Sequence, residues 1–411
     1  MTTRSSIPTI LTTALLVAWS TAVPVPARAR SRREVLVYWD QNEEEDVLIG
    51  GQVKRLVQPW DPNGQMCIFP DHSGPFKGHF TVGYNPTLPS QDDPGGACPN
   101  GGGACLKPLH NPPIGEAIWD QHGNSTPDAT IFVPGPYAIP PSTIGGDVPP
   151  QNGDAWQSGA YNNNSSFTGC AFDHKGHLFA VDIATAQGQV PVPDSGRLIE
   201  WFPPDYKSYC IIYGPDAGGT GPHHVDGTGG LQNPGTMAVF RGDVYVPETG
   251  AERVLRFRHQ SLPRSATDCG PDGVLTPRPQ FDVFIKDPNV ALPSGVARDP
   301  TTHGWAVSNI IGGQAIAWFN DDGSPHTGKG PLPSGDYNPF GLAVAPNGDL
   351  YFVDIHLICD PTGCGPANLG GRVLHVTFKH GVPSTPQAIA TGLNFPTSVT
   401  VCHGRDCPTP P

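Results

Sequence analysis

The sequence lacks the patterns of a helical protein. Its 411 residues include 51 Gly and 49 Pro, and no long window carries an apolar period of 3.6 residues without a Gly or Pro break. After the first 22 residues, no run is apolar enough to cross a membrane. What remains is short strands joined by Gly- and Pro-rich turns, which predicts an all-β protein.

Basic charge is also scarce, with 24 Lys and Arg against 37 Asp and Glu and a net charge of −13. Phosphates repel so acidic a chain, so we expect neither nucleic acid nor an anionic membrane as a partner. The sequence has no C-x-x-C pair of a zinc ribbon, no G-x-S-x-G nucleophile elbow and no G-x-G-x-x-G turn that opens a helix. These absences argue against several common classes of enzyme.

Residues 1–29 have the pattern of a secretory signal peptide. Arg4 supplies positive charge, an apolar stretch follows from Ile10 to Ala22, and Ala27-Arg28-Ala29 is a small-residue cleavage site. The alternative is an uncleaved anchor. We expect residues 30–411 to form one secreted or periplasmic domain that is a monomer and has no membrane span.

Ten cysteines fit an exported protein. Three close pairs would each close a small loop: Cys98/Cys105, Cys359/Cys364 and Cys402/Cys407. The sequence leaves the pairing open for Cys67, Cys170, Cys210 and Cys269.

A unit of short strands recurs along the chain. Its clearest copy reads NPFGLAVAPNGDLYFVDI, then a Cys-bearing insert, then GGRVLHVTF, over residues 338–378. One such unit cannot bury both of its faces, so neighbouring copies must cover them. Further copies occupy 168–213, 235–258 and 295–319, and weaker ones occupy 35–57 and 79–120.

The chain ends complement each other. The first copy lacks an opening strand, while Asn394–Cys402 matches an opening strand and nothing more. We therefore predict a six-bladed β-propeller, closed by pairing 395–402 with the 35–60 region. Gly51–Val57 would be a third strand, Cys67–Phe69 an outer strand and Glu43–Asp46 a solvated loop. Residues 134–166 would form a loop insertion, or 127–166 would hide a seventh blade.

The units NPFGLAVAPNGDLYFVDI…GGRVLHVTF and NPGTMAVFRGDVYVPETGAERVLRF resemble NHL repeats and the group of SMP-30, gluconolactonase and strictosidine synthase-like propellers. The resemblance covers 167–402 well and 35–123 weakly. It implies the fold more than the chemistry, because such propellers host lactonases, esterases, lyases and binding modules. The turns into the first strands lack the metal-binding Asp or Asn of the SMP-30 group, and its early E-G-P motif is missing.

One carboxylate or amide ends each predicted second strand: Asp40, Asn85, Asp182, Glu248, Asn309 and Asp354. Alternating strand directions would bring all six to one face, near the centre of the ring. Oxygen ligands of this kind suit Ca²⁺, so the pattern predicts a calcium site. The alternative is that each residue caps its own turn by accepting backbone N–H groups.

Loop histidines offer proton-transfer groups on the same face. His223 and His224 could act as a general base, or they could be solvated loop residues like His72, His79 and His356. Because no catalytic set is complete, the leading hypothesis is an exported binding or scaffold module for a small molecule, glycan or protein. The alternative is a calcium-dependent lactonase or esterase, in which the metal polarises a carbonyl and His223 or His224 moves the proton.

Overall fold

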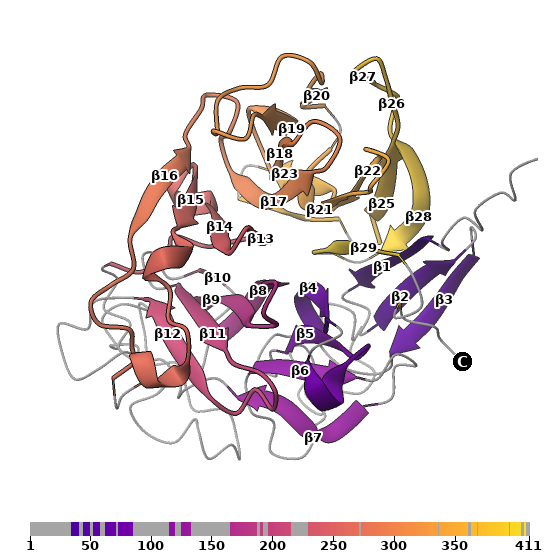
Figure 1. The fold of residues 1–411 in the computed structure, drawn as a ribbon. Helices are drawn as coiled ribbons and strands as arrows, with labels where there is room; N and C mark the ends of the chain where they lie inside the picture. Colours follow the sequence, from indigo (N-terminus) through magenta and orange to yellow (C-terminus); the bar gives the residue numbers. More distant parts are fainter. Residues whose placement is uncertain are drawn as a thin grey trace, which may run out of the picture. The chain divides into compact units, whose positions relative to one another are not determined.

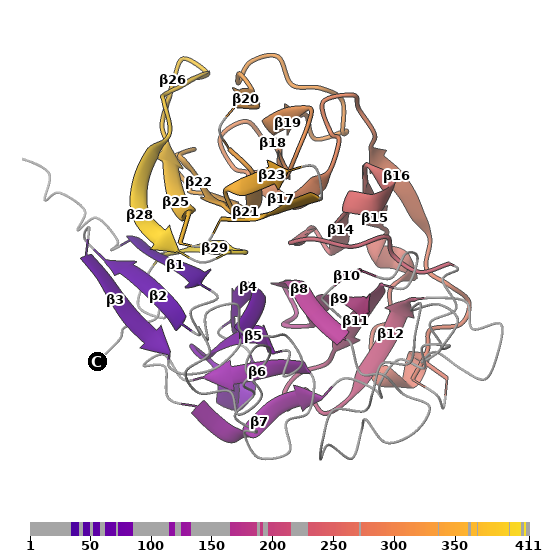
Figure 2. The ribbon, with the colours of Figure 1, turned by 180° about the vertical axis from the view of Figure 1, so that it is seen from behind.

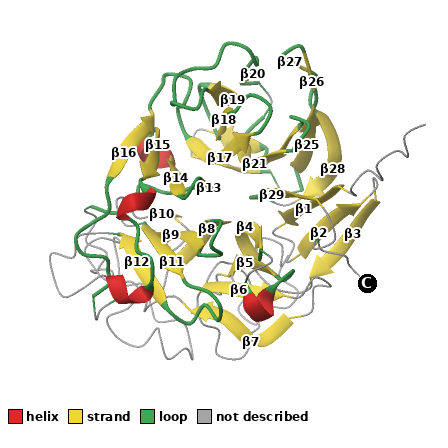
Figure 3. Cartoon of the chain, in the orientation of Figure 1, coloured by secondary structure: helices red, strands yellow, loops and turns green. Residues whose placement is uncertain are grey.

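In the computed structural model, the described elements belong to the unit Arg33–Pro411. It describes residues 34–40, 44–49, 52–57, 62–70, 73–84, 115–119, 125–132, 165–186, 190–191, 196–214, 229–270, 273–335, 337–360, 363–367, 369–393, 395–403 and 407. The proposed signal peptide lies outside these ranges, as does most of the insertion at 134–166. Strands dominate, and the helical turns are short 3-10 segments such as Thr249–Ala251 (Figure 3).

The first half of the unit forms antiparallel sheets. The first has the order β29-β1-β2-β3, from Val399–His403, Glu34–Asp40, Glu44–Ile49 and Gln52–Val57. The second has the order β4-β5-β6-β7, from Pro62–Ile68, Phe80–Tyr84, Gly115–Trp119 and Ser125–Phe132. The third joins β8 (Ser165–Phe172), β9 (Leu178–Ala186), β11 (Arg197–Trp201) and β12 (Tyr209–Tyr213), with β10 (Val190–Pro191) on β9.

The second half repeats one strand order without crossovers. The fourth sheet consists of β13 (Ala238–Phe240), β14 (Asp243–Glu248), β15 (Arg253–Phe257) and β16 (Phe281–Ile285). The fifth consists of β17 (Pro293–Asp299), β18 (Gly304–Asn309), β19 (Gln314–Phe319) and β20 (Leu332–Pro333). The sixth consists of β21 (Pro339–Val344), β22 (Leu350–Asp354), β25 (Gly371–Val376) and β28 (Gln387–Leu393). Two hairpins project from the last sheet: β23 (Leu357–Asp360) with β24 (Gly363–Pro366), and β26 (Phe378–Lys379) with β27 (Val382–Pro383).

The N-terminal strands correct three predictions. Glu44–Asp46 belong to β2 and not to a solvated loop, because the run continues into Val47, Leu48 and Ile49 and pairs with β1. The segment Gly51–Val57 is consequently the fourth strand of its sheet, not the third. Cys67 lies in β4, the opening strand of the next sheet, and not in an outer strand of the first.

The inner strands of successive sheets approach each other closely, and glycine makes this possible. A Cβ atom on Gly235 would collide with the carbonyl oxygen of Ser294, and one on Gly341 would lie 2.6 Å from Thr397 O. Buried hydroxyls join the same strands: Thr168 Oγ1 donates to Pro234 O at 2.6 Å and Ser294 Oγ to Pro339 O at 2.9 Å. Each inner strand is therefore held by its successor along the chain.

Each apolar cluster lies between two successive sheets. Leu198 of β11 packs with Val246 of β14, and Tyr245 of β14 packs with Trp305 of β18 at 4.0 Å between ring centroids. The series continues with Trp318 and Phe352, then with Val373 and Val399. Twisted four-stranded sheets that pack face to face in chain order, with their first strands innermost, define a β-propeller (Figure 1).

Disulfides add cross-links between and within the sheets. Cys67–Cys170 joins β4 to β8, with Cα atoms 6.1 Å apart, and Cys210–Cys269 ties β12 to a later loop, at 6.0 Å. The sequence had left these two pairings open. The short-loop disulfides Cys359–Cys364 and Cys402–Cys407 are confirmed, while Cys98 and Cys105 lie outside the described residues. Within the described ranges, no helix has the length and apolarity needed to span a membrane.

Candidate functional site

Three acidic residues of the second strands form ion pairs with arginines. Asp182, Glu248 and Asp354 are each completely buried. Each lies directly opposite the arginine that opens the third strand, in the pairs Asp182–Arg197, Glu248–Arg253 and Asp354–Arg372. Arg197 Nε donates to Asp182 Oδ2 at 3.1 Å and Arg372 Nε to Asp354 Oδ2 at 3.0 Å, and Arg253 Nε donates to Glu248 Oε2.

Two of these carboxylates also fix the turn into the first strand. Asp354 Oδ1 accepts the backbone N–H of Asn338 at 2.8 Å and that of His356 at 3.1 Å. Glu248 Oε1 accepts the N–H of Gln232 at 2.9 Å. The described oxygens thus already receive guanidinium and amide donors, and such a donor set does not fit a shared calcium ion. It matches the turn-capping alternative of the sequence analysis.

Asn309 differs because it has no arginine opposite. Its third strand opens with Gln314, and Asn309 Nδ2 donates to Gln314 O at 2.6 Å and to Asn289 O at 3.0 Å. Its Oδ1 is buried and has no hydrogen-bond partner among the described residues. The choice of Arg or Gln at the start of the third strand therefore follows the charge at the end of the second. This relation can be read from the repeats, and our sequence reasoning missed it.

The remaining predicted site residues cannot be placed together. Asn85, His223 and His224 lie outside the described residues, as does His72, and only the backbone of Asp40 is described, at the end of β1. Asp182 lies within β9, which continues to Ala186, and not at its end. In the described part of the chain, no group of three or more His, Cys, Asp and Glu residues is arranged to hold a metal ion.

Loops of the last two sheets meet beside Asp354 and Asn309. Asn338 joins them, because its Nδ2 donates to Ile310 O at 3.0 Å and its Oδ1 accepts the N–H of Leu357 at 2.8 Å. The β23–β24 hairpin follows, with Cys359 and Cys364 paired across it; Figure 2 shows β23 beside β17 and β22. Its base is closed by the Ala367 N–H, which donates to His356 O at 2.9 Å.

These loops expose large apolar side chains. Ile311 is 40% exposed, Ile358 is 59% exposed and Leu369 is 53% exposed. We call these three residues the apolar loop surface. Apolar side chains displayed on a backbone fixed by Asn338 and a disulfide lose little conformational entropy on binding, so the surface is suited to contacting an apolar ligand or partner.

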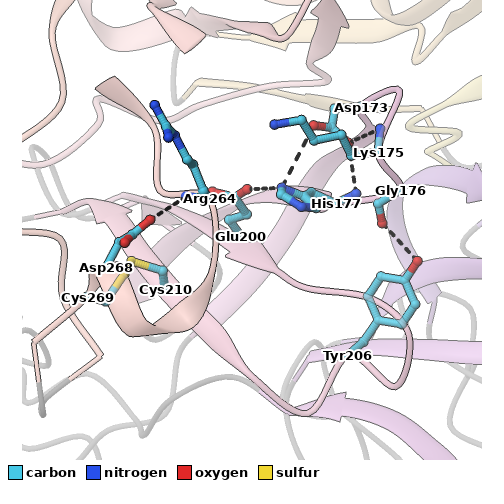
Figure 4. Close-up of polar contacts among 10 residues, drawn as sticks. All are labelled: Asp173, Lys175, Gly176, His177, Glu200, Tyr206, Cys210, Arg264, Asp268 and Cys269. Atoms are coloured by element: carbon cyan, nitrogen blue, oxygen red, sulfur yellow. Dashed lines mark hydrogen bonds and ion pairs between the residues drawn. A yellow bond between two sulfur atoms is a disulfide. The ribbon is translucent and has the colours of Figure 1, made fainter. Parts of the chain in front are cut away.

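A second polar cluster lies at the opposite end of β9, in the turn that follows β8 (Figure 4). His177 Nδ1 lies 2.7 Å from Glu200 Oε1 and 3.8 Å from Asp173 Oδ2. Asp173 Oδ1 accepts the N–H groups of Lys175 and His177, which forms the turn. The hydroxyl of Tyr206 donates to Gly176 O at 2.8 Å.

Burial raises the pKa of Glu200 to about 7, although the hydrogen bond and positive charge of His177 oppose the shift. Burial likewise raises the pKa of Tyr206 to about 12. Glu200 is inaccessible and its Oε2 lacks a hydrogen-bond partner among the described residues. A substrate cannot reach the buried carboxylate of Glu200. Sequence reasoning missed this pair because Glu200 reads as an ordinary outward-facing strand residue.

No family model and no curated protein matches the sequence. Among solved structures, the chain is similar to a chain of a nidogen/laminin complex, at 14% identity and a TM-score of 0.47, over 90% of this chain and 98% of that one. It is similar to regucalcin of Agrobacterium tumefaciens, a calcium-binding protein, at 10% identity and a TM-score of 0.42, over 77% of each chain. It is also similar to a gluconolactonase of Xanthomonas campestris, at 13% identity and a TM-score of 0.43, over 78% of this chain and 83% of that one. Gluconolactonases belong to the group that the repeats resemble.

Proposed function

We propose that this protein is an exported binding module that engages its ligand through the apolar loop surface. The observation that carries the proposal is a contrast within one face. The buried carboxylate Asp354 is bound by Arg372, as Asp182 and Glu248 are by their own arginines in other sheets, whereas Ile311, Ile358 and Leu369 are exposed on the loops beside Asp354. Exposed apolar groups beside a carboxylate that is already paired favour contact by burial over catalysis.

Export is part of this proposal and rests on separate observations. The described cysteines form four disulfides, which are typical of an oxidising compartment. The signal-like segment at residues 1–29 supports the same destination. N-terminal sequencing of the protein recovered from the medium or periplasm of its host should give a chain that begins at residue 30. A chain that retains Met1 in the cytoplasm would contradict export.

We also propose that the sheets form six blades in a closed ring. Backbone pairing of β1 with β29, from Glu34↔His403 to Tyr38↔Val399, supports closure. Thr400 Oγ1 also donates to Met66 O, which links β29 to the second sheet, at 2.9 Å. Deleting residues 394–411 removes β29 and should abolish cooperative unfolding, because it opens an edge on both neighbours. An unchanged melting temperature in the truncated chain would contradict closure.

The apolar loop surface can be tested with the fluorescent probe bis-ANS. We expect Ile358→Asp with Leu369→Asp to lower the fluorescence of the probe bound to the folded chain by about half or more, because a charge at an apolar contact must be desolvated. Val382→Asp is the matched control, since Val382 is 66% exposed on the separate β26–β27 hairpin. Equal loss in the control variant, or no loss in the double variant, would contradict the proposal.

The competing function is the calcium-dependent lactonase or esterase. Calorimetric titration of the EDTA-treated chain with CaCl₂ separates the two, because the binding module should give no saturable heat. A saturable calcium site that is lost in Asp354→Asn, together with hydrolysis of a lactone, would favour the enzyme instead. The histidines to replace in that case are His223 and His224.

A further inference from the structure

Among the described residues, a loop segment covers the outer edge of β12, whereas no strand lies beside the outer edge of β16. β12 is the outer strand of its sheet, and residues 273–275 run beside it. Ile211 N donates to Gly273 O at 2.7 Å and Leu275 N donates to Ile211 O at 3.0 Å. The Cys210–Cys269 disulfide anchors this covering segment, and the N–H of Arg264 is bound by Asp268 just before it (Figure 4).

The covering segment comes from the connection that leads into β16. β16 is the outer strand of the next sheet and pairs only with β15 among the described strands (Figure 1). Its backbone therefore presents an edge to which an extended chain can add. Phe281 is 41% exposed and Val283 is 46% exposed. Because they are two residues apart, they lie on the same face of the strand.

Aromatic rings form the floor beside these two residues. The ring of Phe281 lies 5.2 Å from that of Tyr213 and 5.5 Å from that of Phe257. The Arg278 guanidinium lies over the Tyr213 ring, 4.9 Å from its centroid. On the opposite face of β16, Asp282 is held by Arg256 and Arg258, so the acidic residue of the strand is already neutralised.

The charge of this region identifies the kind of partner. Residues 253–286 contain six Lys and Arg residues against three Asp. Arg253 is paired with Glu248, and Arg256 and Arg258 share Asp282, so a small positive excess remains around β16 in a chain of net charge −13. A local positive charge beside an open edge attracts an acidic segment and repels the same basic edge of another copy. The exposed apolar pair at i and i+2 matches an extended segment with apolar residues at alternate positions.

We propose that β16 is a docking edge for an extended acidic segment of a partner protein, which adds to the sheet as a further strand. The partner segment carries apolar residues at alternate positions that cover Phe281 and Val283, and Asp or Glu residues that face the surrounding arginines. This surface lies on the outer strand of the fourth sheet and is independent of the apolar loop surface.

The probe for this edge is a displayed library of random linear peptides of about ten residues, selected on the purified chain. The enriched peptides should combine alternating apolar residues with Asp or Glu. A synthetic peptide from the selection should bind about tenfold more weakly to Val283→Asp, which removes apolar contact and repels acidic residues. Val382→Asp should bind it as the wild type does. Circular dichroism and melting of both variants establish that they fold.

Salt dependence gives a second measurement. Raising NaCl from about 50 mM to about 300 mM should weaken binding, because it screens the arginines. Enrichment of basic peptides, equal binding to Val283→Asp and wild type, or no enrichment would overturn the proposal. Light scattering that shows a dimer dispersed by Val283→Asp would also overturn it, because it would assign the edge to a second copy of the chain.

Discussion

Two buried carboxylates of this propeller, Asp299 and Glu200, have the same exposure and opposite protonation behaviour. Neither is accessible to solvent. Asp299 Oδ2 accepts from Lys329 Nζ at 2.7 Å and Trp318 Nε1 at 3.2 Å, and its Oδ1 accepts from the Thr301 hydroxyl at 2.7 Å. Glu200 has one described partner, His177, on Oε1 alone.

Burial by itself would raise both pKa values. At Asp299 the hydrogen bonds from Lys329 and Thr301 outweigh burial and lower the pKa below the usual range. At Glu200 burial dominates and raises the pKa to about 7. The two carboxylates differ in the donors around them: Lys329, Thr301 and Trp318 donate to Asp299, whereas Glu200 has His177 as its one described partner.

The largest effect should come from removing the cation beside Asp299. Lys329→Met keeps an apolar stem near Phe378, whose ring centroid lies 3.9 Å from Lys329 Nζ. It leaves a buried charge uncompensated, and the free energy of unfolding at neutral pH should fall by about 3–5 kcal/mol. Urea unfolding measures the loss. The double variant Lys329→Met/Asp299→Asn should lose less stability than Lys329→Met alone. If Lys329→Met is as stable as the wild type, the contrast drawn between Asp299 and Glu200 is wrong.

Glu200→Gln should have the next largest effect, and that effect depends on pH. The folded-state pKa of Glu200, about 7, lies above the ordinary value of 4.5 for a glutamate. The stability that protonated Glu200 supplies is therefore fully present below pH 4.5 and is lost as pH rises through about 7. Relative to wild type, the variant should gain up to roughly 3 kcal/mol over this interval. Thermal melts at several pH values measure it, and parallel curves would contradict the assignment.

The Asp299–Lys329 pair should give the mirror image in acid. Because the pKa of Asp299 is lowered below 3.8, its contribution is present above that pH and is lost as pH falls through the folded-state pKa. The wild type should therefore lose stability below about pH 3.8 relative to Lys329→Met/Asp299→Asn. Denaturant titrations in acid test this sign. If the wild type instead gains stability relative to the double variant as pH falls, the roles given to the two carboxylates are reversed.

Asp173→Asn should have the smallest effect. The charge of Asp173 contributes to the raised pKa of Glu200, while its Oδ1 forms the turn through the N–H groups of Lys175 and His177. Asparagine keeps the acceptor and removes the charge. The effect of Glu200→Gln on stability is measured against pH, once in the wild type and once in Asp173→Asn. In Asp173→Asn, the pH at which half of this effect is reached should be lower by less than about one unit. A move toward higher pH would contradict the electrostatic account.

Sequence reasoning found the propeller because the relevant information is local. The strands β18, β19 and β22 are written in alternating β-branched and aromatic residues with Gly, Asn and Asp turns between them. It failed at β2, where three acidic residues open a strand that pairs with β1 on one side and β3 on the other. A run of acidic residues is typical of a solvated loop, and the charge pattern does not show that the backbone is paired on both sides.

The candidate site was likewise predicted only in part from the sequence. Glu248, Asn309 and Asp354 at the ends of β14, β18 and β22 were identified from the repeats, because their spacing is fixed within each copy. The arginine partners of the acidic residues were missed, although Arg197, Arg253 and Arg372 occupy matching positions at the starts of the third strands. The exposure of Ile311 and Ile358 could not be predicted, because an isolated isoleucine in a loop does not show which neighbour covers it.

By itself, the sequence determined the strand periodicity, the turns, the two short-loop disulfides and the acidic charge, because each depends on residues close together in the chain. Only the tertiary structure decided which buried carboxylates are paired and which titrates. It also decided the pairing of Cys67 with Cys170 and of Cys210 with Cys269, and which outer edge is covered. These outcomes depend on atoms far apart in sequence, whose distances and shared burial are set when the sheets pack together.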